Sequence, residues 1–104
     1  MSSIIQATTP LIKYVFKTIN VTDITEAYLT IDQNRAKILE KDIDEATVDT
    51  ENNLICWGLT QEETLHFANT YITVMLNWKT TNGIRGASKK DTIFIENNLK
   101  KEVI

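Results

Sequence analysis

Cysteine, histidine and proline each occur only once in the 104-residue chain, and glycine occurs three times. The single cysteine, Cys56, has no partner for an internal disulfide, which excludes a disulfide-stapled secreted scaffold. Cys56 and the single histidine, His66, are too few to form a first-row metal shell unless many carboxylates join them. The sequence therefore predicts no metal site and no bound cofactor.

A strong charge of either sign is also missing, since 14 Asp and Glu residues stand against 11 Lys and Arg residues, for a net charge of −3. Nucleic-acid affinity depends on a basic surface that neutralises phosphates, so nucleic acid is not an expected partner. No run approaches the ~18 consecutive apolar residues that span a bilayer, and residues 1–10 lack the cationic and apolar segments of a signal peptide. We expect a protein without membrane contact that is kept on the cytoplasmic side of its cell.

What the sequence does have is alternation of apolar and polar side chains, which is the period of a half-buried β-strand. Alternation is clearest in three segments, at residues 11–17, 27–32 and 70–80. In the last of these, Ile72 and Val74 alternate with Thr73 and Met75. Seven short strands are predicted in all, at residues 11–17, 27–32, 36–39, 46–48, 54–59, 70–80 and 84–95.

Residues that favour turns separate these strands. Gln33-Asn34-Arg35 and residues 49–53 can reverse the chain, because Asn tolerates a positive φ. Asn82-Gly83 is the strongest two-residue hairpin signal in the sequence and predicts a type I′ turn, in which both residues have positive φ. Gly86, inside the strand that follows, is expected to mark a bulge.

Residues 54–59 are nearly all apolar, which is typical of a strand that is covered on both faces. We therefore expect Cys56 to be buried as a small hydrophobic residue. The same reasoning places Trp57, and Trp78 in the strand at 70–80, in the core.

A capping box follows this strand. In the segment Thr60-Gln61-Glu62-Glu63, the Thr60 hydroxyl can accept a hydrogen bond from the Glu63 amide, and the Glu63 carboxylate can accept one from the Thr60 amide. One short helical turn is predicted here, with Thr60 and Glu63 as its structural cap.

Seven short strands, frequent turns and one helical turn predict an all-β fold, specifically a small antiparallel β-sandwich of the immunoglobulin-like (Ig-like) kind. The expected domain comprises residues 10–96. Residues 1–9 are predicted to be a flexible N-terminal arm. Residues 97–104 are predicted to be a C-terminal tail, either a frayed helical turn or an extended segment.

The sequence offers no catalytic unit. His66 is the only candidate base for a Ser or Cys nucleophile, and Cys56 is expected on a buried strand. Glu62 and Glu63 are neighbours in sequence, so they do not face each other across a cleft as a glycosidase pair does. We therefore predict a protein that is not an enzyme and that has no catalytic, cofactor-binding or metal-ligating residues.

Protein interaction is the remaining role, and the candidates for it are apolar or aromatic side chains that the alternation points outward or that lie in the tail. The candidate interaction residues are Tyr28, Tyr71, Met75, Leu99, Val103 and Ile104.

Several short segments carry a resemblance to a known family. They are Thr8-Thr9-Pro10, Leu29-Thr30-Ile31-Asp32-Gln33, Leu59-Thr60-Gln61-Glu62-Glu63-Thr64, Thr81-Asn82-Gly83 and Ala87-Ser88. Over residues 8–104 the chain resembles small β-rich structural or accessory proteins of the virion, of about one hundred residues, encoded by phages and prophages of Gram-positive bacteria. The chain departs from that family at its first hairpin, where Gln33-Asn34-Arg35 replaces Gln-Xaa-Gly.

The resemblance implies a non-catalytic virion protein that docks onto other virion subunits in the head, neck or tail, after assembly in the host cytoplasm. Several copies, and a homo-oligomer, are compatible with that role. Exposed sheet edges and short arms suit such docking. Two alternatives stay open: a module that binds host surface glycans through its aromatic side chains, and a phage-encoded inhibitor of a host protein.

Overall fold

The structure is a computed structural model that describes residues 3–104. Within these residues the chain forms nine β-strands, one α-helix and two 3₁₀ turns. The strands are β1 (Ser3–Ile5), β2 (Leu11–Val15), β3 (Ile24–Gln33), β4 (Ala36–Asp42), β5 (Thr47–Asp49), β6 (Leu54–Gly58), β7 (Tyr71–Thr80), β8 (Arg85–Ala87) and β9 (Asp91–Glu96). The helix is α1 (Gln61–Leu65), and the 3₁₀ turns are η1 (Val21–Asp23) and η2 (Ile43–Glu45).

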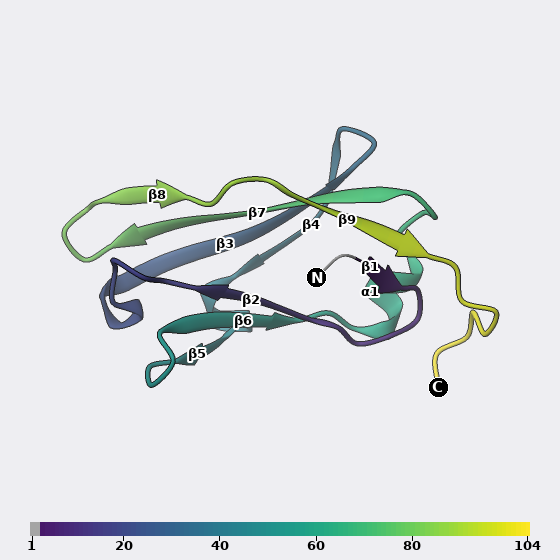
Figure 1. Cartoon of the computed structure of the whole chain (residues 1–104), viewed down its shortest axis with the longest axis horizontal. Helices are drawn as coiled ribbons and strands as arrows, with labels where there is room; N and C mark the ends of the chain where they lie inside the picture. The colour runs from purple at the N-terminus through teal and green to yellow at the C-terminus, as the bar shows by residue number, and fades with distance from the viewer. Residues whose placement is uncertain (1–2) are drawn as a thin grey trace.

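The strands form two sheets that pack face to face (Figure 1). The larger sheet has the order β1-β9-β7-β3-β4, with β8 paired to β7, and the smaller sheet has the order β2-β6-β5. All pairs are antiparallel except β1 with β9, which is parallel. The predicted all-β sandwich is confirmed.

The strand order resembles that of an immunoglobulin variable-type domain, although β1 pairs with β9 in the larger sheet and no strand lies beyond β4 in the described residues. Such domains place strands B, E and D in one sheet and strands G, F, C and C′ in the other. Here β2, β6 and β5 occupy the positions of B, E and D, while β9, β7, β3 and β4 occupy those of G, F, C and C′. The chain reaches this arrangement without the disulfide of antibody domains, since its one cysteine is free.

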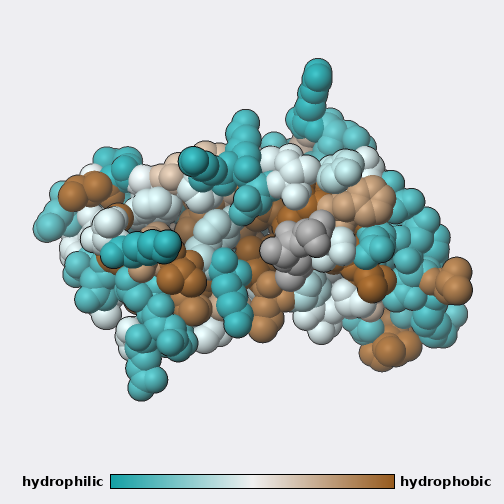
Figure 2. Space-filling view, in the orientation of Figure 1, coloured by the Kyte–Doolittle hydropathy of each residue, from teal (hydrophilic) through white to brown (hydrophobic). Residues whose placement is uncertain are grey.

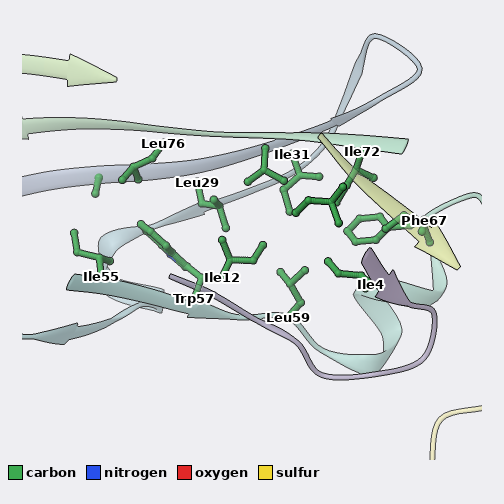
Figure 3. Close-up of a cluster of buried hydrophobic side chains, with 14 of the residues drawn as sticks. Ile4, Ile12, Leu29, Ile31, Ile55, Trp57, Leu59, Phe67, Ile72 and Leu76 are labelled. Atoms are coloured by element: carbon green, nitrogen blue, oxygen red, sulfur yellow. The ribbon is translucent and has the colours of Figure 1, made fainter. Parts of the chain in front are cut away.

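The core lies between the two sheets and is built from the inward-pointing residues of both (Figure 3). Trp57 on β6 is its largest fully buried side chain, and its indole Nε1 donates a hydrogen bond of 2.9 Å to the Asp42 carbonyl oxygen. Trp78 on β7 is half-buried at the edge of the core and packs edge-to-face on Phe16, with ring centroids 5.2 Å apart. The prediction that the tryptophans pack in the core is therefore confirmed for Trp57, whereas Trp78 packs against the core from its edge.

The type I′ prediction at Asn82-Gly83 is wrong. Gly83 has a φ of 80°, but Asn82 is not among the residues with positive φ. The two consecutive positive φ values of a type I′ turn occur instead at Asn34 (54°) and Arg35 (67°), in the hairpin that joins β3 to β4. The Asn34-Arg35 turn contains no glycine, so its positive φ values carry a modest backbone energy cost. The turn is adopted because its twist matches the twist of the flanking strands.

The predicted strand at 84–95 is divided into β8 and β9. Ser88 lies at the break, where its amide donates to the Leu76 carbonyl and its hydroxyl accepts from the Leu76 amide. Gly86, which was expected to mark a bulge, is instead paired directly opposite Trp78. A Cβ at residue 86 would lie 2.4 Å from an indole carbon of Trp78, so glycine is present because the ring lies against its backbone.

Residues 3–9 correct the predicted flexible arm. Ser3–Ile5 form β1 in the larger sheet, and Ile4 is buried with 2% of its surface exposed. The side-chain amide of Gln6 donates to the Phe67 carbonyl over 2.8 Å, and the Gln6 amide donates to Glu96. The domain therefore begins before residue 10; residues 1–2 of the predicted arm lie outside the described residues.

The outer face of the smaller sheet corrects the prediction for residues 54–59. The side chains of Ile55 and Trp57 are buried, but Leu54 and Cys56 point the other way and are only half-buried. No second layer covers that face in the described chain, so Cys56 is not a core residue. Although residues 54–59 are nearly all apolar, β6 has one face in the core and the other face open to solvent.

Candidate protein-interaction surfaces

The outer face of the larger sheet collects the three predicted strand residues. Tyr28 on β3 pairs with Asn77 on β7, and Met75 on β7 pairs with Thr30 on β3. Tyr28 and Met75 are therefore diagonal neighbours on one face. Tyr71, at the start of β7, shares that face because successive odd-numbered residues of a strand point the same way.

Two further side chains extend this surface. The ring of Phe94 on β9 packs edge-to-face against Tyr71, with centroids 5.1 Å apart. Ile5 on β1, opposite Glu96, continues the face to the next strand and is 44% exposed. We call Ile5, Tyr28, Tyr71, Met75 and Phe94 the aromatic face. Phe94 and Ile5 escaped the sequence analysis because their contribution depends on the pairing of β1 and β9 with β7.

Charged side chains border the aromatic face beside Tyr28. The Tyr28 hydroxyl donates a hydrogen bond of 2.9 Å to Glu26, and Glu26 lies 3.7 Å from the Lys79 ammonium. The hydrogen bond to the Glu26 carboxylate, together with the negative charge of that group, raises the pKa of Tyr28 above its ordinary value. Tyr28 therefore stays a neutral hydrogen-bonding group across the physiological pH range.

The predicted structural cap is confirmed. The Glu63 amide donates to the Thr60 hydroxyl over 3.1 Å, and the Thr60 amide donates to the Glu63 carboxylate over 2.8 Å. Sequence reasoning did not find the third member, Lys41 on β4, whose ammonium lies 2.9 Å from the same carboxylate. This cluster connects α1 to the larger sheet and is a structural feature, not a binding site.

The C-terminal residues Leu99, Val103 and Ile104 lie in a segment without helix or strand. The structure has no helical turn in the tail, and bends at Leu99 and Glu102 mean that the tail is not extended throughout either. Leu99 is fully exposed, Val103 is 53% exposed and Ile104 is 88% exposed. The interaction role predicted for these three residues, and for Tyr28, Tyr71 and Met75, stays a prediction.

The residues with potential chemistry lie on unrelated elements. His66 is exposed at the C-terminal end of α1, whereas Cys56 lies on the outer face of β6. Residues 3–104 contain no group of three or more His, Cys, Asp or Glu side chains placed to hold a metal ion. Among the same residues, no helix has the length and apolar character to cross a membrane.

Comparison of the sequence with known protein families and with curated proteins finds no match.

Proposed function

We propose that the chain is a non-catalytic protein-binding domain that docks through the aromatic face onto neighbouring subunits of a phage particle. The observation that carries the proposal is the exposure of this face. The solvated face of an antiparallel sheet is ordinarily polar, yet Tyr71 is 58% exposed, Ile5 44% and Tyr28 39%. Exposed apolar and aromatic side chains gathered on one surface are typical of protein interaction sites.

The rigidity of the surface supports docking. Tyr28 and Met75 lie on β3 and β7, two ten-residue strands that pair with each other over most of their length. Tyr71 and Phe94 are paired across β7 and β9, and Ile5 lies on β1, which pairs with β9. Each side chain of the face is therefore carried by a paired strand of the larger sheet. Tyrosine and phenylalanine lose little side-chain entropy when they are buried at an interface, which makes them efficient contacts.

The assignment to a virion rests on the sequence resemblance and not on the geometry. Its test is mass spectrometry of purified particles of the phage that encodes the chain, which is expected to find the protein as a stoichiometric component. Tyr71→Ser is expected to reduce the amount in the particle at least tenfold, as loss of an aromatic interface residue does. Thr92→Ser, on the same face, is the matched control and is expected to leave incorporation unchanged. Absence of the protein from the particles, or full incorporation of Tyr71→Ser, would contradict the proposal.

Glycan binding is the second candidate, and the edge-to-face pair of Tyr71 and Phe94 favours it, because exposed aromatic rings can stack on sugars. It predicts glycan-array binding that Tyr71→Ala abolishes, with no role in assembly. Specific capture of one host protein, with the chain missing from particles, would instead select the inhibitor.

A further inference from the structure

The outer edge of β2 is a free strand edge. The Leu59 amide donates to Pro10 and the Phe16 amide donates to Asn53, so even-numbered residues of β2 bond to β6. In an antiparallel ladder the intervening residues direct their N–H and C=O groups to the opposite side. The backbone groups of Leu11, Lys13 and Val15 therefore face outward, and no strand within residues 3–104 pairs with them.

A groove accompanies this edge. It has a volume of about 340 Å³ and runs between β2 and β9, with Ile12, Val74 and Ile93 as apolar lining and Tyr14 and Asp91 as polar lining. Figure 2 looks onto this side of the sandwich and shows apolar side chains between the two sheets. A strand added to β2 would bury alternate side chains in this groove.

The C-terminal segment has the properties that an added strand needs, because few hydrogen bonds hold it and its apolar side chains are free to be buried. Two hydrogen bonds join residues 98–104 to the rest of the described chain, from Asn98 to the Gln6 carbonyl and from the Ile104 amide to the Gln61 side chain. Its apolar side chains are exposed, and the segment projects from the body of the molecule at the lower right of Figure 1.

We propose that residues 99–104 of one copy add as an antiparallel strand to β2 of a second copy, with Glu102 opposite Lys13. Lys13 has no ion pair in the described chain, while Glu102 is paired only with Lys100, at 3.2 Å. Opposite charges directly across an antiparallel pair stabilise the pairing. The edge of β2 belongs to the smaller sheet, whereas the aromatic face is the outer face of the larger sheet. The inference therefore goes beyond the proposed function and does not depend on it.

The register is consistent along the whole segment. With Glu102 opposite Lys13, Ile104 lies beside Leu11 on the outer face, where Leu11 is 52% exposed. On the inner face Val103 lies beside Ile12, in the apolar part of the groove. Lys101 then lies beside Tyr14, next to the Asp91 carboxylate that also lines the groove. A parallel addition would exchange these two inner partners and place Lys101 against the apolar lining.

Sedimentation velocity of the full-length chain at increasing concentration tests the proposal. The wild-type chain is expected to self-associate, and Lys13→Glu and Glu102→Lys are each expected to weaken association by about fivefold, because an attraction becomes a repulsion. The double variant, with both charges exchanged, is expected to regain wild-type association. Lys37→Glu on β4 is the matched charge control and is expected to have no effect.

Lys13→Pro provides an independent test. The Lys13 amide faces away from β6, so proline removes the donor needed by the added strand and spares the β2–β6 ladder. It is expected to abolish association with an unchanged circular-dichroism spectrum, whereas Tyr71→Ser is expected to leave association intact. A wild-type chain that is monomeric up to about 1 mM, or association that survives both Lys13→Pro and Glu102→Lys, would overturn the inference.

Discussion

The Lys41 ammonium lies 2.9 Å from the Glu63 carboxylate, and this ion pair ties β4 of the larger sheet to the first turn of α1. Lys41 also donates to the Gly58 carbonyl at the end of β6, over 3.2 Å. The two side chains are only 12% and 24% exposed. One lysine therefore links the two sheets at the end of the sandwich where α1 lies.

We predict that this contact makes the free energy of unfolding depend on pH in the acid range. Partial burial alone would raise the pKa of Glu63, but the hydrogen bond from the Thr60 amide and the ion pair with Lys41 outweigh it and hold the pKa below 4.5. A lowered pKa in the folded state adds stability above the unfolded-state pKa, and this stability is lost as the pH falls through the folded-state pKa. Glu63→Gln is expected to cost about 1 kcal/mol at neutral pH and much less near pH 3.

Urea unfolding of both proteins at the two pH values measures the difference. Glu62→Gln, in the same turn but outside the capping box, is the control and is expected to be nearly neutral. A Glu63→Gln penalty of the same size at both pH values would show that the carboxylate's charge does not contribute.

The contact between Gly86 and Trp78 gives a second prediction. A Cβ at residue 86 would lie 2.4 Å from the indole, whereas a Cβ at Gly58 would meet only the Leu11 side chain at 3.6 Å. Gly86→Ala is therefore expected to displace the ring and destabilise the fold by about 2 kcal/mol, the scale of overpacking. Gly58→Ala is expected to change stability by less than about 0.5 kcal/mol. Thermal unfolding compares the two, and equal effects would mean that the ring moves aside without strain.

Asn53 gives a third prediction, because its side chain bonds three backbone groups of the segment at residues 16–21. Its side-chain oxygen accepts from the Val21 amide, and its side-chain nitrogen donates to the carbonyls of Phe16 and Ile19, all within 2.8 Å. Its φ is 54°. Asn53→Gly keeps this backbone conformation accessible but leaves the three groups without partners, and is expected to cost about 2–3 kcal/mol.

Asn52→Gly is the control, because the Asn52 side chain bonds only to the nearby Asp49. It is expected to cost less than 1 kcal/mol. A penalty at residue 53 no larger than that at residue 52 would mean that solvent replaces the three lost bonds.

The sequence patterns that succeeded are those in which a local rule and the tertiary structure agree. Alternation in residues 70–80 identified the buried positions of β7 because one face of that strand meets the core. The capping box was recognised because all its hydrogen bonds lie within four residues. The outward position of Tyr28, Tyr71 and Met75 follows from the same alternation.

The patterns that failed depend on which strands meet. Leu54 and Cys56 appeared buried because they are apolar, but only the sheet arrangement decides whether a second layer covers them. Lys41 is next to Glu63 only because β4 returns to the end of the sandwich where α1 lies. Three-residue strands such as β1 are too short for periodicity to reveal.

Strand β1 gives the last prediction, because its two isoleucines face opposite ways. Ile4 is 2% exposed and belongs to the core, whereas Ile5 is 44% exposed on the aromatic face. Ile4→Ala is expected to destabilise the domain by about 2–4 kcal/mol, the cost of a cavity in a core. Ile5→Ala is expected to cost less than about 1 kcal/mol. In hydrogen exchange the Gln6 amide, bonded to the Glu96 carbonyl, is expected to be protected in wild type and to exchange faster in Ile4→Ala. Equal stability of the two variants, with an unprotected Gln6 amide, would restore residues 3–9 to the status of an arm outside the domain.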